Sequence, residues 1–204
     1  MSNEQLTMTN DKDLFSGKLV RLAALDSEKD AEALARWDLD SEYLRQLDSR
    51  PQLPNRAKKI REGIEKEQSE DPNTIALSVR ALADDRLIGF VAFEGINWRN
   101  ADTFAAIGIG ERDYWGKGYG TDALRVLLRF AFDELNLQRV SLSFLEGNDR
   151  AQRSYEKCGF RYEGRERQAW VYDGRRWDEI YMGLLRGEWE AMNHEADAGR
   201  EGPA

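Results

Sequence analysis

The segment DYWGKGYGTDALRVLLRFAFDELNL, residues 113–137, joins a glycine-rich loop directly to an apolar helix. Gly116, Gly118 and Gly120 leave the backbone bare at the point where the helix begins. The start of a helix has unpaired N–H groups and a positive dipole end, so such a loop is suited to binding a phosphate group. The glycines could instead serve only to turn the chain between a strand and a helix. The loop alone does not decide between these two interpretations.

Apolar runs typical of strands lie on both sides of this loop. TIALSVRAL, RLIGFVAFEGI and TFAAIGIG precede it, and RVSLSFLE follows the helix. The strand–helix–strand unit around the loop should pair in parallel. A hairpin with the turn YDGRR follows near the C-terminus. Helices are expected from DSEKDAEALARWD and from RAKKIREGIEKEQSE, and EYLRQLD would extend the first of them. We therefore predict an α+β fold with a mixed, mostly antiparallel sheet and helices on both faces.

The 204 residues are predicted to form one domain, 14–189, between flexible tails at 1–13 and 190–204. No apolar run approaches the length needed to span a membrane, and the N-terminus lacks a signal-peptide pattern. A single cysteine, Cys158, fits a reducing compartment. We therefore expect a cytoplasmic protein without a membrane partner. The net charge of −8 argues against a nucleic-acid partner, which would require a basic face.

The chain contains one histidine, His194, and it lies in the polar segment NHEADAGREGPA. A Ser–His or Cys–His nucleophilic site therefore has no histidine in the body of the protein to use. A histidine-rich metal site is excluded in the same way, and no metal is expected. Any proton transfer must be carried out by Asp, Glu, Tyr, Lys or water.

The spacing of the glycines excludes the common nucleotide-binding loops. A Walker loop requires two glycines separated by four residues and then Lys and Ser or Thr, but Lys117 is followed by Gly118. A Rossmann fingerprint requires G-x-G-x-x-G, and the third glycine is wrongly spaced for it. Dinucleotides and nucleoside triphosphates are therefore not expected as ligands.

The stretch NDRAQRSYEKCGF, downstream of the loop, provides a second motif. Together the two segments resemble the GCN5-related N-acetyltransferase (GNAT) superfamily. In that family an [R/Q]-x-x-G-x-[G/A] loop binds the pyrophosphate of coenzyme A, and an N-x-x-A-x-x-x-Y-E-K-x-G-F stretch lies beside the cofactor thiol. The C-terminal hairpin looks like the RimJ/RimL-like branch, which contains ribosomal-protein alanine and spermidine acetyltransferases. The second motif is matched at Asn148, Ala151, Tyr155, Glu156, Lys157, Gly159 and Phe160.

The resemblance implies an N-acetyltransferase that moves an acetyl group from acetyl-CoA to a primary amine by direct attack in a ternary complex. It also implies central strands that splay apart to admit the cofactor. The acceptor is left open among a protein N-terminus, a polyamine and a small-molecule amine. The oligomeric state is also left open, with a homodimer as one option. The alternative function is a non-catalytic acyl-CoA-binding sensor or assembly module of the same fold.

The resemblance assigns cofactor contacts to the glycine loop, to the strand before it and to Asn148, which could also cap a helix. Trp115 departs from the Arg or Gln of the family, so the pyrophosphate would depend on backbone N–H groups, with Lys117 able to add charge. Glycine at 108 and 110 fits either a weakened strand or a bulge. The predicted cofactor-binding residues are Ile107, Gly108, Ile109, Trp115, Gly116, Lys117, Gly118, Tyr119, Gly120, Thr121 and Asn148.

The same match makes Tyr155 the predicted acid that protonates the leaving thiolate, with simple core packing as the alternative role. An alkyl amine, with a pKa of about 10, must lose a proton before it attacks. Glu94, Asp102 and Glu111 lie on or beside the central strands. Glu94 interrupts an apolar run and is the first candidate for the base, and a chain of water molecules is another. Cys158 is predicted to be a structural residue.

The acceptor pocket is expected to form from the early helices, the INWRNAD loop and the final hairpin. Trp98, Tyr172 and Trp177 are aromatic residues in the loop and the hairpin, and they are predicted to wall a substrate groove. Ordinary packing is the alternative for each of them.

Overall fold

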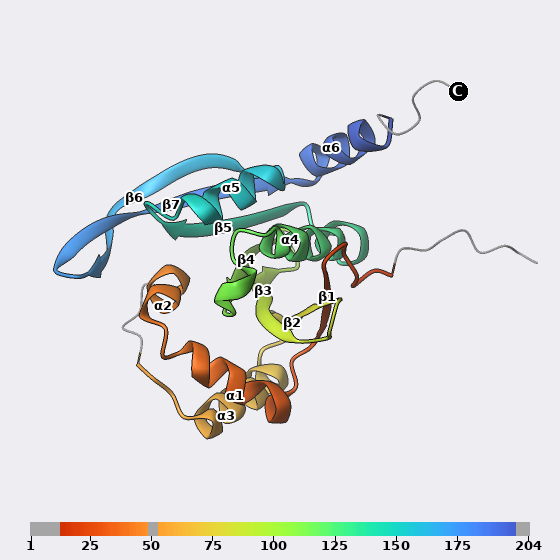
Figure 1. Ribbon diagram of the computed structural model, residues 1–204. Coiled ribbons are helices and arrows are strands. Elements are labelled where there is room, and N and C mark those ends of the chain that lie inside the picture. The colour runs from red at the N-terminus through yellow and green to blue at the C-terminus, as the bar shows by residue number, and fades with distance from the viewer. Residues whose placement is uncertain (1–12, 49–52, 199–204) are drawn as a thin grey trace, which may run out of the picture.

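A computed structural model of the protein describes residues 13–48 and 53–198. Its seven strands form one sheet in the order β1-β2-β3-β4-β5-β7-β6 (Figure 1). Neighbouring strands are antiparallel, except that β4 and β5 are parallel, as the strand–helix–strand unit predicts. The α+β fold with a mostly antiparallel sheet is therefore confirmed. The strands are β1 Val20–Ala24, β2 Ile75–Ala81, β3 Leu87–Asn97, β4 Asp102–Ile109, β5 Arg139–Leu145, β6 Arg161–Tyr172 and β7 Arg175–Leu185.

Helices lie between the strands along the chain and follow the last one. A short 3-10 turn, η1, lies ahead of α4, and a π-helical turn, η2, continues it. The predicted N-terminal tail lies outside the described residues except for Asp13. The helices of the described segments are α1 Ser27–Trp37, α2 Ser41–Leu47, α3 Ala57–Glu70, η1 Arg112–Tyr114, α4 Tyr119–Arg129, η2 Phe130–Glu134, α5 Asp149–Lys157 and α6 Arg186–Ala198.

The segment EYLRQLD forms a separate helix, α2, instead of extending the first one. The carboxylate of Asp40 accepts hydrogen bonds from the backbone N–H groups of Glu42 and Tyr43. An aspartate in this position satisfies donors that have no partner inside the helix, and it therefore starts a new helix. The change of direction brings α2 next to β4 and β5.

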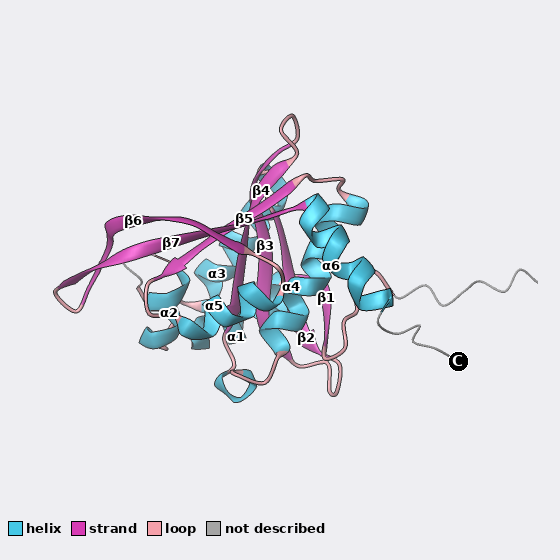
Figure 2. Cartoon of the chain, turned by 90° about the horizontal axis from the view of Figure 1, so that it is seen from above, coloured by secondary structure: helices cyan, strands magenta, loops and turns pink. Residues whose placement is uncertain are grey.

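Side chains on β4 alternate between the two faces of the sheet. Ile107 and Ile109 lie against Gly120 of α4, whereas Gly108 lies against Tyr43 of α2. The helices α4 and α5 pack together on one face, and α1 and α2 cover the other (Figures 1 and 2). The main hydrophobic core lies between the sheet and α4. The prediction of helices on both faces is confirmed.

The central strands β4 and β5 separate after a short paired region. They pair only at Asp102–Arg139, Thr103–Val140 and Phe104–Ser141. Beyond this point β4 stays paired with β3, and β5 stays paired with β7. From residue 105 to 109 the edge of β4 that faces away from β3 has no strand partner within the described residues. The predicted splaying of the central strands is confirmed.

The two last strands form a long hairpin that projects beyond the body of the sheet and overhangs α2 (Figures 1 and 2). Asp173 and Gly174 connect them, with φ values of 49° and 69°. Positive φ at both central residues is what a two-residue hairpin turn requires, because its twist then matches that of the strands. The outer strand β6 is exposed along most of its length.

The C-terminal segment differs from the expected flexible tail, because α6 extends to Ala198 and includes His194. Trp189 packs against the ring of Phe132, with centroids 5.2 Å apart, and Met192 lies against Gly159. These two apolar residues, one helical turn apart, anchor a segment whose overall polarity concealed them. None of the helices in the described ranges combines the length and apolar character needed to cross a membrane.

Asp122, in the first turn of α4, ties this helix to the start of β1. Its carboxylate accepts hydrogen bonds from the backbone N–H groups of Leu19 and Val20, at 2.7 and 3.1 Å. Asp122 is 7% exposed, and a Cβ on Gly17 would lie 2.3 Å from its Oδ2 atom. The glycine therefore lets the chain approach the carboxylate closely, and this contact positions α4 relative to β1.

We expect Asp122→Ala to lower the free energy of unfolding by about 3 kcal/mol, because two backbone donors lose their charged acceptor in a buried site. Urea denaturation followed by circular dichroism measures the change. Asp133→Ala is the matched control, since Asp133 is exposed on the same helical segment. Equal stability of the two variants would contradict the role given to Asp122.

Candidate active site

A cleft of about 260 Å³ opens where β4 and β5 separate. Four elements surround it: α2, the end of β4, the glycine loop with the start of α4, and α5. Most of the predicted cofactor-binding residues, together with Tyr155, lie around it. The lining residues are Tyr43, Gln46, Leu47, Ile107, Gly108, Ile109, Tyr114, Trp115, Gly116, Gly118, Gly120, Thr121, Asn148, Arg150, Ala151, Arg153, Ser154, Tyr155 and Lys157.

The glycine loop presents backbone, without side chains, to this cleft. Gly116 and Gly118 have φ values of 70° and 92°, which other residues rarely adopt. Gly118 directly precedes the first residue of α4, so the N-terminal end of that helix opens on the cleft. Two predicted residues of the loop do not line the cleft. Lys117 is exposed, and the ring of Tyr119 packs edge-on against Tyr114 at 4.8 Å.

Trp115 is fixed at the mouth of the loop by contacts on its ring and its nitrogen. Its Nε1 atom donates a hydrogen bond to the carbonyl of Ile109 at 2.6 Å. The guanidinium carbon of Arg150, from α5, lies 3.7 Å from the centroid of the indole ring, and that of Arg112 lies at 4.9 Å. The guanidinium of Arg150 also donates to Gln46 Oε1 of α2 at 2.9 Å. A cation from α5 therefore lies beside the loop position where this chain has tryptophan.

The helix α5 makes its wall of the cleft positively charged. Arg150, Arg153 and Lys157 all line it. Burial lowers the pKa of Arg150 below its usual value, but the group remains charged at neutral pH. The hydroxyls of Thr121 and Ser154 are hydrogen-bonded at 2.9 Å and connect α4 to α5 at the cleft. Cations and the bare start of a helix together suit an anionic ligand.

Tyr155 lies between the core and the cleft. It is 7% exposed, and its ring packs against Phe144 and Phe160 at centroid distances of 5.5 and 6.1 Å. Its hydroxyl has no hydrogen-bond partner within the described residues, and burial raises its pKa well above 10. The hydroxyl therefore stays protonated and can act as a donor. Asn148 caps α5 by accepting from the N–H of Ala151 at 3.1 Å, and it lines the cleft as well.

Tyr43 of α2 is a cleft residue that the sequence motifs did not reveal. A Cβ on Gly108 would lie 2.6 Å from its hydroxyl oxygen, so the glycine is what allows α2 to approach β4. Gly110 has the same function for Trp37, whose ring a Cβ would meet at 2.0 Å. The Tyr43 hydroxyl is buried with no partner among the described side chains and backbone. Burial raises its pKa, as do the charges of nearby aspartates, so it also stays protonated.

A second cavity of about 280 Å³ lies between α2, the turn after β5 and the hairpin. Tyr172 and Trp177 stack on each other in its wall, with centroids 4.9 Å apart and ring planes at 3°. Arg45 lies over the ring of Tyr172 at 5.5 Å. Gln46 and Asn148 line this cavity and the cleft alike, so the two spaces adjoin.

The remaining predicted residues lie outside both cavities. Trp98 is 53% exposed in the turn after β3, and its Nε1 atom donates to Asn73 at 3.0 Å. Glu94 is exposed on β3, opposite Phe104 of β4. Cys158 is fully buried, and burial raises its pKa to about 12, so it is an unreactive core thiol.

Glu111 and Asp102, the other candidates for the base, also lie outside the two cavities. Glu111 forms ion pairs with Arg36 and Arg86 and accepts a hydrogen bond from Trp37 at 3.0 Å. Burial acts to raise its pKa, but the hydrogen bonds and these cations outweigh it, and the pKa is lowered. A carboxylate held in this way connects α1 to the strands and is poorly suited to accept a proton.

Comparison with known proteins defines the family. A family model described as "Acetyltransferase (GNAT) domain" matches residues 20–161. The chain therefore belongs to the GNAT acetyltransferase family. It is 30% identical over 156 residues to "SPbeta prophage-derived uncharacterized N-acetyltransferase YokL" of Bacillus subtilis (strain 168), a match that covers 76% of this chain and 85% of that protein.

Solved structures have the same fold. The crystal structure of a "Probable acetyltransferase" superposes with a TM-score of 0.75 at 28% identity and covers 84% of this chain and 96% of that one. Spermidine N-acetyltransferase from Vibrio cholerae, in complex with CoA and spermine, superposes with a TM-score of 0.75 at 23% identity and covers 84% and 98%. At 23% identity, the similarity to the spermidine N-acetyltransferase concerns the fold alone.

We expect Tyr43→Phe to raise the free energy of unfolding of the ligand-free protein by about 1 kcal/mol. The change removes a buried hydroxyl that has no partner among the described groups and leaves the ring in place. Thermal and urea denaturation measure the difference. Tyr162→Phe, at a position that is 61% exposed, is the control and should change stability by less than about 0.5 kcal/mol. A destabilised Tyr43→Phe protein would show that the hydroxyl has a structural partner.

Proposed function

We propose that the protein transfers an acetyl group from acetyl-CoA to a primary amine, by direct attack in a ternary complex. One observation carries the proposal: the bare start of α4, the cations of α5 and the protonated Tyr155 meet in one cleft at the split of the sheet. Membership in the GNAT family supports acetyl transfer. The structural neighbour named as a complex with CoA and spermine supports an acyl-CoA donor and an amine acceptor.

The pyrophosphate of acetyl-CoA would bind at the glycine loop from Gly116 to Thr121. Arg150 would supply the polar contact that Arg or Gln makes in the family at the position of Trp115, because its guanidinium lies over that ring. The pantetheine arm would follow residues 107–109, where the edge of β4 has no strand partner within the described residues. Amide groups of the arm would then pair with backbone groups of β4, and one of them with the Tyr43 hydroxyl.

Tyr155 would provide the proton for the leaving group. The amine nitrogen forms a bond to the thioester carbonyl carbon, the carbon–sulfur bond breaks, and the thiolate takes the proton of the Tyr155 hydroxyl. A tyrosine whose pKa is raised by burial is a weaker acid than an ordinary thiol, so the transfer requires that the same burial also raises the basicity of the thiolate, and that the proton lost by the amine nitrogen returns to the Tyr155 oxygen.

The second cavity would hold the acceptor. Stacked Tyr172 and Trp177 provide a flat aromatic wall, and Glu42 and Glu146 also line it. Aromatic faces and carboxylates are both favourable for a cationic amine. A protein N-terminus, a polyamine and a small-molecule amine all meet this description.

The test of the function is a thiol-release assay with acetyl-CoA and a panel of polyamines, small amines and peptides with free N-termini. At least one amine should give acetylated product with one thiol released per acetyl group. Binding of acetyl-CoA by calorimetry without transfer to any amine would instead identify a non-catalytic acyl-CoA sensor.

With an active acceptor, Tyr155→Phe should reduce kcat about 10²-fold while acetyl-CoA affinity stays nearly unchanged. The substitution keeps the ring in contact with Phe144 and removes only the proton donor. Steady-state rates at saturating acceptor, with calorimetric affinities, measure both quantities. An unchanged kcat in Tyr155→Phe would show that the Tyr155 side chain has only a structural role.

Arg150→Gln should weaken acetyl-CoA binding about tenfold, because a charge-assisted contact to the pyrophosphate is lost. The difference from the unsubstituted protein should shrink in 0.5 M salt, where charges are screened. Calorimetry at two salt concentrations makes the comparison. Arg167→Gln, at an exposed position on β6, should bind like the original protein. An equal loss of acetyl-CoA affinity in both variants would show that the effect comes from the overall charge of the protein and not from a contact in the cleft.

A further inference from the structure

The strands β5 and β7 expose different side chains on the two faces of the sheet beyond the split. Phe144 points to the α5 side, where its ring meets Tyr155. Ser143 and Leu145 alternate with it and therefore face α2. Ser143 is only two residues past Ser141, the last residue of β5 that pairs with β4. A polar side chain thus stands on the α2 side at the apex of the split.

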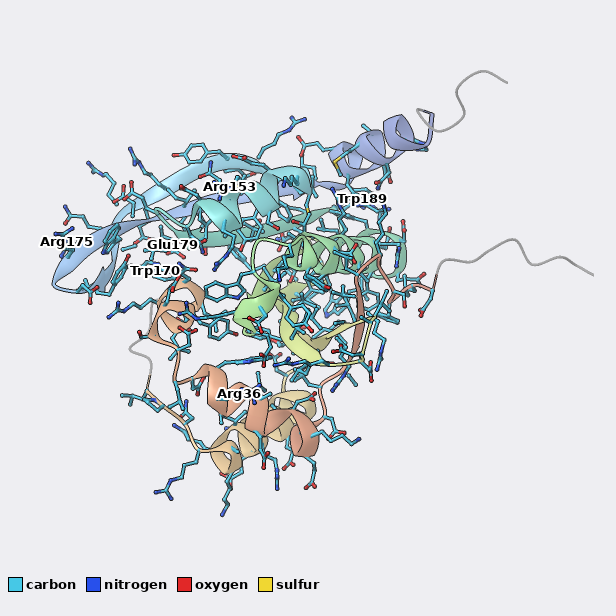
Figure 3. All side chains as sticks on the ribbon, viewed as in Figure 1. Arg36, Arg153, Trp170, Arg175, Glu179 and Trp189 are labelled. Atoms are coloured by element: carbon cyan, nitrogen blue, oxygen red, sulfur yellow. The ribbon has the colours of Figure 1, made fainter. Side chains whose placement is uncertain are left out.

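Glu179 of β7 extends to the same point. Its Oε1 atom accepts a hydrogen bond from the Ser143 hydroxyl at 2.7 Å, and its Oε2 atom accepts one from the Tyr181 hydroxyl at 3.2 Å. Burial and the neighbouring carboxylates raise the pKa of Tyr181 to about 12, so this hydroxyl is a permanent donor. Figure 3 shows Glu179 and Trp170 on the part of the hairpin that overhangs α2. The carboxylate is half-buried and its orientation is fixed from two strands.

Glu179 does not itself line the acceptor cavity, but two of its neighbours do. Leu145 is the register partner of Glu179 and lines the cavity, as does Trp177 on the same face of β7. An amine held against Trp177 would therefore have the Glu179 carboxylate beside it and the split between β4 and β5 ahead of it.

We propose that Glu179 is the base that takes the proton from the acceptor ammonium group on the α2 side of the sheet, while Tyr155 acts on the opposite side of β5. This inference rests on the proposed N-acetyltransferase function. Glu179 lies next to Leu145 and Trp177, which line the acceptor cavity, whereas Glu94 is exposed on β3, opposite Phe104.

The protons balance over one turnover. The ammonium form of the acceptor loses its first proton to Glu179, which later releases it to solvent. The neutral amine forms the bond to the thioester carbon, and the carbon–sulfur bond breaks. The nitrogen loses a second proton when it becomes an amide, and this proton replaces the one that the thiolate takes from Tyr155.

Other charged groups surround Glu179 and define the controls. Glu166 of β6 is its register partner, and its carboxylate also accepts from the Tyr181 hydroxyl, at 3.4 Å. Arg165 is directed to two other carboxylates, Glu146 at 3.7 Å and Asp178 at 3.3 Å. From α2, Glu42 and Arg45 face the cavity. Among these groups, Glu179 is the one bonded to Ser143 at the split.

The test compares Glu179→Gln with the original protein over pH 6 to 10, with an amine acceptor found by the thiol-release assay. Glutamine keeps the size of the side chain and removes its ability to take a proton. We expect kcat/KM at pH 7 to fall about 10²-fold, and the loss to shrink toward pH 10, where the amine deprotonates by itself. Acetyl-CoA affinity, measured by calorimetry, should stay within about twofold, because Glu179 does not line the cofactor cleft.

Three comparisons decide the result. Glu166→Gln, which removes the same charge from the other partner of Tyr181, should lose less than about threefold at every pH. Glu179→Asp, which keeps the carboxylate on a shorter arm, should retain more activity at pH 7 than Glu179→Gln. A loss in Glu179→Gln that is the same at every pH would overturn the proposal, and so would the pH-dependent loss appearing in Glu94→Gln or Glu166→Gln instead. If the original protein acetylates no amine, the proposed function fails first, which is a separate outcome.

Discussion

The parallel pairing of β4 with β5 stops after three residue pairs, and the organisation of the candidate site follows from that limit. Each strand keeps one satisfied edge, β4 with β3 and β5 with β7. Beyond the paired region the other edge of β4 lies along the cleft, with backbone groups that require a partner. An extended ligand with its own amide groups can supply that partner, in the way that a further strand would.

Aromatic side chains from α1 and α2 pack against the glycines at the end of β4. Tyr43 and Trp37 lie directly on Gly108 and Gly110, where any larger residue would push the helices away. The glycines thus have a packing function that neither a weakened strand nor a bulge describes. They let aromatic rings cover one face of β4, which is paired with β3, while β5 is paired with β7.

The sequence predicted what depends on local patterns. Alternating apolar residues gave the strands, and Asp173–Gly174 gave the hairpin turn. The spacing of Gly116, Gly118 and Gly120 placed a bare backbone at a helix start. These features need only a few neighbouring residues for their recognition, so tertiary structure did not alter them. The position of Tyr155 beside the loop was implied by the resemblance to the GNAT family and not by a local pattern.

Residues whose position depends on contacts distant in the sequence could not be predicted. Tyr43 reaches the cleft because Asp40 starts a new helix, and Glu179 reaches the split because of the register between β5 and β7. Glu94 drew attention by interrupting an apolar run, yet that strand position is exposed and lines neither cavity. A charged residue within an apolar strand sequence indicates that one face of the sheet is polar at that position. Only the tertiary structure shows whether the active site lies on that face.

The stacking of Arg150 on Trp115 has an evolutionary consequence. The cation beside the loop comes from α5, and the indole provides the surface on which it rests. A relative with Arg or Gln at the position of Trp115 would already have a polar side chain there and would gain nothing from a second one stacked upon it. In an alignment of homologues the residues at positions 115 and 150 should therefore vary together. A search that requires Arg or Gln as the first residue of the loop motif would overlook relatives in which α5 supplies the polar group instead.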